Sequence, residues 1–236
     1  MSFDIITQFR YKSTRLPAKV LLNYLNTNFL SFLIKSLKKS KYARRIIIAC
    51  PEDEYSEIFM FFSKKLKIDF FSFKGDENDV LSRYYNCAKK FSSKNIIRIT
   101  SDCPFINPLI IDLMTTYYKK NKLQFLTNNK PRFIPHGFDC EIFSFDLLKK
   151  TFLSANLKYD KEHVTSWMYK NDFKKKNNFK IFDKNYSNLR LTLDNINDYV
   201  YFIKNDKLLK NIANKKNIKK YLNKLENENF LRKTIN

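Results

Sequence analysis

The chain has 236 residues, of which 44% are hydrophobic and 16% aromatic, so its composition is globular, with room for one α/β domain and little for a second. No apolar run approaches the roughly 20 residues that span a bilayer, and the first residues lack the basic start and small-residue cleavage site of a signal peptide. The 45 basic and 23 acidic residues give a net charge of +22, which taken alone would suggest nucleic acid or an anionic membrane surface as a partner.

Two kinds of segment alternate at short spacing up to residue 130. Apolar, β-branched runs that stop at turn residues predict strands, and apolar residues spaced three or four apart predict helices. In chain order, the expected elements are strand Phe3–Thr7, helix Phe29–Leu37, strand Arg45–Cys50, helix Asp53–Leu66, strand Asp69–Phe73, helix Asn78–Phe91, strand Asn95–Thr100, a helix from Pro108 to about Lys120, and strand Gln124–Thr127. This alternation predicts an α/β fold with a mostly parallel sheet and helices on both faces.

The pattern changes after residue 130. The expected elements are then strand Phe138–Phe145, helix Leu147–Ala155, helix Lys161–Tyr169, strands Phe179–Phe182 and Leu189–Leu193, and helix Ile196–Lys204. The domain is expected to span residues 1–205, and residues 206–236 to form its Lys/Asn-rich C-terminal tail, helical at best. Because ligands bind beyond the carboxyl ends of strands in open α/β sheets, the loops after residues 7, 100 and 193 are expected to carry the chemistry.

The cysteines and the basic charge narrow the classes of protein to which the chain could belong. The four cysteines are scattered without a Cys-x-x-Cys pair, which argues against a zinc site and a disulfide framework and fits a reducing cytoplasm. The lysines accompany abundant Asn, Ile, Phe and Tyr, as expected for a gene rich in A and T, so they are interpreted as solvated faces. Arginines kept against this bias are informative, since their planar fork suits phosphates and carboxylates; the candidates are Arg10, Arg15, Arg83, Arg98 and Arg190.

The first loop, residues 8–19, reads Gln-Phe-Arg-Tyr-Lys-Ser-Thr-Arg-Leu-Pro-Ala-Lys. Its cations, hydroxyls and exposed amides suit a polyphosphate, although a Walker loop is excluded because Gly-x-x-x-x-Gly-Lys is absent. On charge alone, an ordinary basic surface loop is an equal alternative.

The pattern Arg-Tyr-x-Ser-Thr-Arg-Leu-Pro-x-Lys in this loop resembles the signature of the CMP-sugar synthetases, which include the 3-deoxy-manno-octulosonate and acylneuraminate cytidylyltransferases. The closest similarity is to the branch named for spore coat polysaccharide biosynthesis protein SpsF. The resemblance implies a Rossmann-like, GT-A-like nucleotide-diphospho-sugar transferase fold. The loop residues that it implies at the nucleotide are Gln8, Arg10, Ser13, Arg15 and Lys19. Glycine is usual in the branch where Lys12 stands, and in the family where Ala18 stands, so the loop geometry is open.

A second segment, residues 75–84, resembles the family's Gly-x-x-x-Asp-Val-Leu-x-Arg, which lies near the nucleotide. The resemblance implies nucleotide contacts for Gly75 and Arg83. From the residues alone, Asn78 or Asp79 could instead cap the following helix, and Arg83 could pair with Asp79 at helical spacing.

A third segment, Arg98–Pro104, resembles the family's Arg-x-Thr-Gly-Asp-x-Pro, with Ser101 in place of the glycine. The resemblance implies that Ser101 touches the nucleotide and that Asp102 ligates Mg²⁺ at the triphosphate. Mg²⁺ takes one or two carboxylates with phosphate oxygens and waters, so a second aspartate is expected. Asp194 is the candidate because its segment matches Arg-Leu-Thr-x-Asp; the alternative is that Asp194 caps the next helix.

The acceptor is expected at two further segments, residues 135–141 and 162–165, which resemble Pro-x-Gly-x-Asp-x-Glu and Glu-His-Val-Thr of the same branch. They hold both histidines, and a histidine could orient or deprotonate the attacking oxygen. The alternatives are structural histidines, with His163 buried against Trp167, and a solvated polar strand face for the two acidic residues. The residues expected at the acceptor are His136, Asp139, Glu141, Glu162, His163 and Arg190.

The expected reaction is attack of an acceptor oxygen on the α-phosphorus of CTP, with release of pyrophosphate, in surface polysaccharide or glycoconjugate biosynthesis. Arg10, Arg15 and Lys19 would stabilise the leaving group, and Mg²⁺ on Asp102 and Asp194 would offset developing charge. The acceptor is expected to be a sugar acid or related small molecule, and relatives are commonly dimers, which suggests a homodimer. The alternatives are a glycosyltransferase that uses a nucleotide-sugar and, less favoured, a basic nucleic-acid-binding protein.

Overall fold

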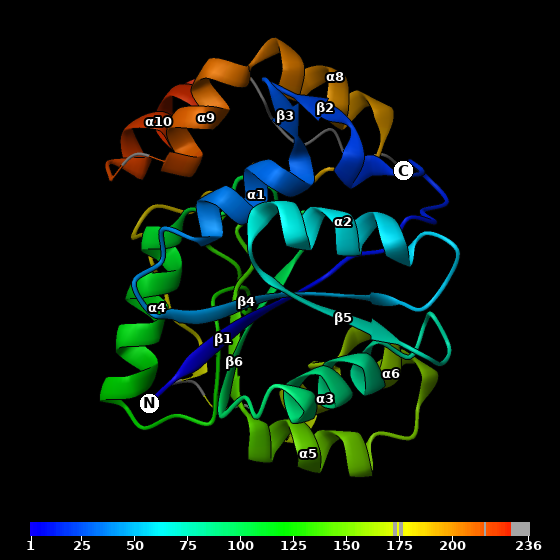
Figure 1. Ribbon diagram of the computed structural model, residues 1–236. Helices are drawn as coiled ribbons and strands as arrows, with labels where there is room; N and C mark the ends of the chain where they lie inside the picture. Colours follow the sequence, from blue (N-terminus) through cyan, green and yellow to red (C-terminus); the bar gives the residue numbers. More distant parts are fainter. Residues whose placement is uncertain (172–173, 175–176, 215, 228–236) are drawn as a thin grey trace.

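The computed structural model describes residues 1–171, 174, 177–214 and 216–227. Its centre is a six-stranded sheet in the order β5-β4-β1-β6-β8-β7 (Figure 1). The strands are β1 (Phe3–Gln8), β4 (Ala43–Pro51), β5 (Asp69–Phe73), β6 (Asn95–Thr100), β7 (Phe125–Thr127) and β8 (Glu141–Ser144). The first four of these pair in parallel, while β8 runs antiparallel to both β6 and β7. The mostly parallel sheet expected from the alternation of elements is therefore confirmed.

Helices cover both faces of the sheet, as predicted. The helices are α1 (Phe29–Leu37), α2 (Ser56–Leu66), α3 (Val80–Lys90), α4 (Pro108–Lys120), α5 (Phe145–Ser154), α6 (Lys158–His163), α7 (Ser166–Asn171), α8 (Ile196–Lys204), α9 (Asp206–Asn214) and α10 (Ile218–Asn227). Successive residues of a strand face opposite sides, so Ile5 packs in the core with α1 and α4 while Ile6 packs with α3 and α5. In Figure 1, α1 and α2 lie on one side of the sheet, and α3 and α5 on the other.

Side-chain caps explain where several helices begin. The cap accepts a hydrogen bond from a backbone N–H of the first turn that has no partner within the helix. The residues that do this are Asn28 for α1, Asp79 for α3, Asn107 for α4, Ser144 for α5 and Asn195 for α8. The alternative interpretation of Asp79 as a helix cap is confirmed, and that of Asp194 is wrong because Asn195 takes that position.

Two predicted strands are wrong. Residues 179–182 and 189–193 lie in extended backbone outside the ladders, with single bridges from Asn178 to Thr127 and from Arg190 to His136. Their apolar residues reflect burial, since Leu191 and Leu193 are fully buried in the core without belonging to a strand. The predicted strand 138–145 is shorter, because β8 begins only at Glu141 and Phe145 already begins α5.

The predicted helix 161–169 is divided into α6 and α7. Val164 has the positive φ of 54° and ψ of −58°, and the Thr165 N–H donates to the His163 carbonyl at 2.5 Å, which closes a γ-turn. Sequence reasoning also missed the two-stranded hairpin of β2 (Asn23–Tyr24) and β3 (Thr27–Asn28). The short 3-10 helix Lys19–Leu21 precedes that hairpin.

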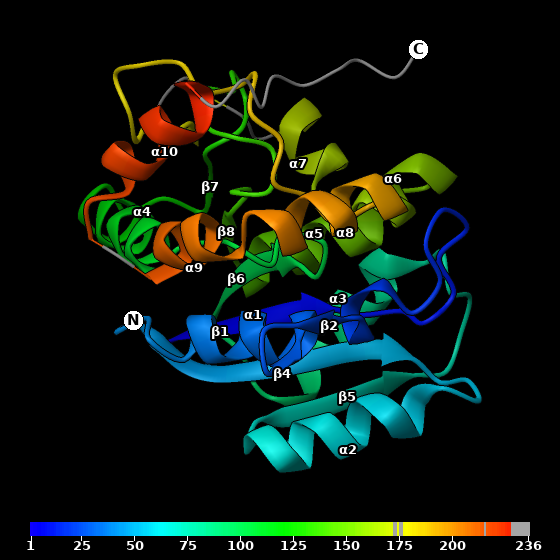
Figure 2. The same cartoon turned by 90° about the horizontal axis from the view of Figure 1, so that it is seen from above.

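The C-terminal helices α9 and α10 contribute to the same core as α1 and α4. Their buried apolar residues are Leu208, Leu209, Ile212, Ala213, Ile218, Leu222 and Leu225. The Asn107 side chain donates to the Ile212 carbonyl at 2.7 Å, which ties α9 to the start of α4. Figure 1 shows α8, α9 and α10 at the top of the molecule, and in the view from above in Figure 2, α8 and α9 run across its middle. Residues 228–236 of the expected tail lie outside the described part of the chain.

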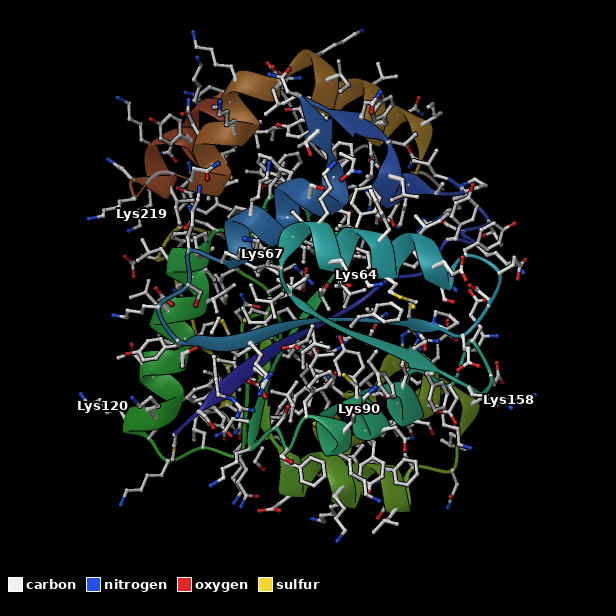
Figure 3. The ribbon with its side chains drawn as sticks, viewed as in Figure 1. Lys64, Lys67, Lys90, Lys120, Lys158 and Lys219 are labelled. Atoms are coloured by element: carbon white, nitrogen blue, oxygen red, sulfur yellow. The ribbon has the colours of Figure 1, made fainter. Side chains whose placement is uncertain are left out.

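The surface lysines are distributed over many elements. Figure 3 labels six that project from different parts of the surface: Lys64, Lys67, Lys90, Lys120, Lys158 and Lys219. They belong to α2 and its C-terminal cap, α3, α4, α6 and α10. Within the described ranges, no helix combines the length and apolar character needed to cross a bilayer.

Candidate active site

A cleft opens at the carboxyl ends of β1 and β6, where the sequence placed two of its chemical loops. Eight of the predicted site residues line it: Gln8, Arg10, Lys19, Arg83, Ser101, Asp102, Glu162 and His163. The structure therefore brings together segments that are more than 150 residues apart in sequence. Sequence reasoning did not assign Glu77 or Thr100 to a ligand, yet they line the same cleft, together with the candidate arginine Arg98.

The loop after β1 is closed at its neck by a hydrogen bond from the Ala18 N–H to the Tyr11 carbonyl, at 2.9 Å. Ala18 has φ 53° and ψ 20°, a left-handed conformation that glycine adopts at lower cost. This conformation is consistent with the glycine that the family resemblance led us to expect at this position. Ser13 and Arg15 lie in the loop but outside the lining of the cleft.

Asp194 gathers three cations. Its Oδ1 lies 3.0 Å from Lys19 Nζ and 3.1 Å from Arg15 Nη2, while its Oδ2 lies 2.6 Å from Arg190 Nη2. Burial opposes ionisation of Asp194, but these cations, Lys19 foremost, lower the pKa of its carboxyl below the usual value. Asp194 is therefore a carboxylate at neutral pH, and it connects the first loop to the segment before α8.

The segment of Asp194 also joins the loop after β6, because the Leu193 N–H donates to the Asp102 carbonyl at 2.9 Å. The two predicted aspartates thus belong to neighbouring backbone segments. Asp198, which sequence reasoning missed, accepts hydrogen bonds from the Asp194 and Asn195 N–H groups at 2.8 and 3.0 Å. It also receives Arg190 Nη2 at 3.1 Å, so it orients both Arg190 and Asp194. The signal for it was the Asn-x-x-Asp capping box.

Arg83 is a buried cation in the cleft wall, with a side chain only 2% exposed. Its Nη2 donates to the Glu77 carbonyl at 2.6 Å, and its Nε has no hydrogen-bond partner among the described residues. Burial lowers the pKa of this guanidinium, since desolvation disfavours the charged form. The alternative pairing with the Asp79 side chain is not the observed contact, because Asp79 caps α3. An under-satisfied buried cation gains most from an anionic ligand.

The acidic pair of the predicted acceptor segment has protein partners. Glu141 Oε2 lies 2.6 Å from Arg98 Nη1, and its Oε1 accepts from the Thr165 and Tyr169 hydroxyls, both at 2.8 Å. Asp139 lies 2.5 Å from Arg132 Nη2 and precedes β8. Neither carboxylate lines the cleft, so a role at the acceptor stays a prediction, and their ion pairs do not fit the alternative of a solvated polar strand face.

The two histidines take different positions. His163 is exposed at the edge of the cleft, 4.3 Å from the Tyr159 ring centroid, so its predicted burial against Trp167 is wrong. His136 lies outside the cleft lining, where its backbone bridges to Arg190.

The two glycines also lie outside the lining of the cleft. Gly137 has φ +101°, and a Cβ there would meet the Leu191 backbone at 2.6 Å, so this position requires glycine. Gly75 is exposed, and a Cβ there would meet the Phe73 ring at 2.6 Å.

A basic cleft at the carboxyl ends of a mostly parallel sheet defines a nucleotide-binding α/β transferase. The chain belongs to the cytidylyltransferase family, whose model, described as Cytidylyltransferase, matches residues 5–235. It is therefore a CTP-dependent nucleotidyltransferase. A solved structure of a cytidylyltransferase from Leptospira borgpetersenii serovar Hardjo-bovis is 30% identical, with a TM-score of 0.87 over 100% of this chain and 99% of that one.

Two curated proteins are also similar in sequence. An uncharacterized protein of Methanocaldococcus jannaschii is 35% identical over 84% of this chain and 80% of its own length. Spore coat polysaccharide biosynthesis protein SpsF of Bacillus subtilis is 32% identical over 46% of each chain. A solved CMP:2-keto-3-deoxy-manno-octonic acid synthetase complexed with CTP shares the fold, with a TM-score of 0.66, 13% identity and coverage of 88% of this chain and 99% of that one.

Proposed function

We propose that this protein transfers CMP from CTP to a sugar acid or a related acceptor and releases pyrophosphate, in the biosynthesis of a surface polysaccharide or glycoconjugate. The observation that carries this proposal is the convergence of Arg10, Lys19, Arg83 and Asp102 on one cleft. The relatives support the substrate class, since one is named for spore coat polysaccharide biosynthesis and another is a CMP-sugar-acid synthetase complexed with CTP.

The cleft residues divide into a phosphate side and an acceptor side. Arg10 and Lys19, which line the cleft, neutralise the β- and γ-phosphates, together with Arg15 from the same loop, and Arg83 offers its unpartnered Nε. An acceptor oxygen attacks the α-phosphorus, the bond between the α-phosphorus and the bridging oxygen breaks, and pyrophosphate leaves with that oxygen. His163, at the edge of the cleft, takes the proton of the acceptor hydroxyl.

Mg²⁺ is the proposed cofactor, and the donor chemistry of the site fits it. Asp102, which lines the cleft, and Asp194, whose oxygens contact Lys19, Arg15 and Arg190 in this structure, would supply hard carboxylate oxygens from segments joined by the hydrogen bond between Leu193 and Asp102. In the part of the chain that the structure describes, no cluster of three His, Cys, Asp or Glu side chains could hold a metal by itself, so nucleotide phosphates would complete the coordination. When bound, Mg²⁺ supplies electrostatic stabilisation of charge that develops between the α- and β-phosphates.

The substitution Asp102→Asn tests this assignment, because it removes a charge and keeps the shape of the side chain. We expect CTP-dependent pyrophosphate release to fall at least about 100-fold, while the circular dichroism spectrum stays that of the wild type. Asp183→Asn is the matched control, since that carboxylate is 99% exposed and distant in sequence from the cleft residues. Full activity in Asp102→Asn would show that the metal assignment is wrong.

A screen of the four nucleoside triphosphates against acidic sugars, with pyrophosphate release as the readout, would identify the substrates. A glycosyltransferase would instead release a nucleoside diphosphate or monophosphate from a nucleotide-sugar. A nucleic-acid-binding role is not favoured, because the lysines labelled in Figure 3 are spread over several elements. The homodimer and the cytoplasmic location stay predictions, which light scattering and cell fractionation would test.

A further inference from the structure

The loop of residues 8–19, called the phosphate loop below, packs against residues 54 and 55, which lie outside every motif described above. The Tyr11 ring stacks on the Tyr55 ring, with centroids 3.9 Å apart and planes 6° from parallel. Beside this stack, Lys12 Nζ lies 2.9 Å from Glu54 Oε1 and 5.6 Å from the centroid of the Tyr55 ring. The loop therefore has a platform formed by residues 54 and 55.

The platform is itself fixed to the sheet and to α2. The Glu52 N–H donates to the Phe73 carbonyl at 2.8 Å, which ties the segment to the end of β5. The Tyr55 N–H donates to Asp53 Oδ1 at 2.9 Å, and Tyr55 immediately precedes the first residue of α2. A ring stacked on Tyr55 is thus held relative to the sheet rather than relative to the loop alone.

Tyr11 transmits this support to the phosphate-binding cations. It follows Arg10 directly, and its carbonyl accepts the hydrogen bond from Ala18, the residue before Lys19. Both cations that line the cleft from this loop are therefore one residue away from the Tyr11–Ala18 neck. Displacing the Tyr11 ring would shift Arg10 and Lys19 together.

The stack contributes more to this support than the adjacent ion pair does. The Lys12 and Glu54 side chains are 54% and 59% exposed, and ion pairs this exposed are screened by water and contribute little. Stacked aromatic rings gain contact area and dispersion energy, which water does not screen as it screens charges. Removing the Tyr55 side chain should therefore disturb the loop more than removing the Glu54 side chain does.

We propose that Tyr55 is a positioning residue for nucleotide binding: its ring holds Tyr11, and through it Arg10 and Lys19, in the geometry that receives the triphosphate. This proposal rests on the function proposed for the loop. It deepens that function because it names a support outside the phosphate-binding motif.

The test is calorimetric binding of CTP and CMP to Tyr55→Ala and Tyr55→Phe. Because the loop serves the β- and γ-phosphates, we expect Tyr55→Ala to weaken CTP binding about five-fold, in the range of one stacked aromatic pair, while CMP binding changes less than about two-fold. Tyr55→Phe keeps the ring and should bind CTP as the wild type does. In steady state, the KM for CTP should rise in Tyr55→Ala with a smaller change in kcat.

A matched control and a double-mutant cycle separate positioning from general damage. Tyr85 stacks on Phe152 at 4.2 Å and 6°, between α3 and α5 and outside the cleft lining, so Tyr85→Ala removes the same chemistry and should leave CTP binding unchanged. Tyr11→Ala combined with Tyr55→Ala should weaken CTP binding no more than either change alone, because both remove one interaction.

Three results would overturn the proposal: CTP binding unchanged in Tyr55→Ala, CMP binding weakened as much as CTP binding, or an equal loss in Tyr85→Ala. The proposed function fails separately, and this proposal with it, if the wild-type protein binds no CTP. A wild-type protein that binds CTP and releases pyrophosphate, beside a Tyr55→Ala variant with the same affinity for CTP, would reject the positioning role alone.

Discussion

Asp139 lies in the connection between β7 and β8, next to the paired residues Thr127 and Glu141, and holds this connection together. Arg132 contacts both of its oxygens, at 2.5 and 3.2 Å, and Asn129 Nδ2 donates to Oδ1 at 2.9 Å. The Gly137 N–H donates to Oδ2 at 3.2 Å, and Gly137 itself has a positive φ and no room for a Cβ beside the Leu191 backbone. A carboxylate that accepts this many hydrogen bonds mainly stabilises the conformation of its own loop.

Asp139→Asn should therefore lower the free energy of unfolding at pH 7, by about 2 kcal/mol, the range of hydrogen bonds to a charged group. Burial opposes ionisation of Asp139, but the Arg132 and Asn129 contacts lower the pKa of the carboxyl below its usual 3.8. A group whose pKa is lower in the folded state stabilises above its unfolded pKa, and this stability is lost as the pH falls through the folded value. Urea unfolding should show a difference between the two proteins that is constant near neutrality and narrows below pH 3.8.

Asp183→Asn changes a carboxylate that is 99% exposed, so its free energy of unfolding should match that of the wild type both near neutrality and at low pH. If Asp139 acts mainly on the acceptor, its substitution would instead raise the KM for the acceptor and leave the unfolding curve unchanged. A difference in stability that persists undiminished at low pH would contradict the ionic origin of the effect.

For single residues, the sequence predicts which side chains lie near the site better than it predicts which residues they contact. Arg10 and Asp102 follow predicted parallel strands, and the carboxyl ends of such strands meet at one edge, so their convergence could be foreseen. The engagement of Glu141 by Arg98 could not, because 43 residues separate the two and no local spacing encodes the pair. Strand alternation also suggested that Glu141 would point into the site, whereas its contacts turn it toward Thr165 and Tyr169.

At the scale of a single loop, Ala18 holds a conformation that disfavours a Cβ. Ala18→Gly should raise the free energy of unfolding by about 1 kcal/mol, because the relief of left-handed strain exceeds the added entropy of the unfolded chain. Chemical denaturation monitored by circular dichroism measures this change. The activity should be kept, since the neck hydrogen bond to Tyr11 uses only backbone atoms.

Ala88→Gly in α3 provides the opposite case. Ala88 is buried within a regular helix, where glycine costs about 1 kcal/mol relative to alanine, so the same substitution should destabilise the protein there. If Ala18→Gly also destabilises the protein, the left-handed conformation is not the determining factor at that position.

Long periodic elements were predicted closely, and short ones were not. Strands β1, β5 and β6 and helices α1, α4 and α8 match their expected ranges within a residue, because burial on one or both faces leaves a clear apolar pattern. The γ-turn at Val164 leaves no such signal, since a β-branched residue at positive φ is contrary to local preference and is imposed by packing. The residues of the β2–β3 hairpin are too few to show alternation.

At the scale of the whole molecule, alternation of elements predicted a mostly parallel sheet with helices on both faces, but the strand order came only from the structure. The antiparallel strand β8 sits between β6 and β7, so β7 forms that edge of the sheet. Long-range packing decides such an order, which local patterns do not encode. The same limit applies to the C-terminal helices, whose lysines and asparagines predicted a tail while their apolar residues enter the main core.

Because α10 packs in the main hydrophobic core, substitutions of its buried residues should lower the stability of the whole domain. Leu222 is fully buried in the core cluster that also holds Leu33 and Ile110, and Leu→Ala substitutions at such sites cost about 3 kcal/mol through lost burial and the cavity left behind. Leu222→Ala should therefore lower the free energy of unfolding measured in urea. Lys220→Ala, on the exposed side of the same helix, should leave that free energy within about 0.5 kcal/mol of the wild type.

The C-terminal helices as a whole give a second prediction. Because a domain of this kind is stable by only about 5–15 kcal/mol, removing residues 206–236, with the seven buried apolar side chains of α9 and α10, should abolish cooperative unfolding. A truncated protein that still unfolds cooperatively at the wild-type midpoint would show that α9 and α10 are an accessory to the core and not a part of it.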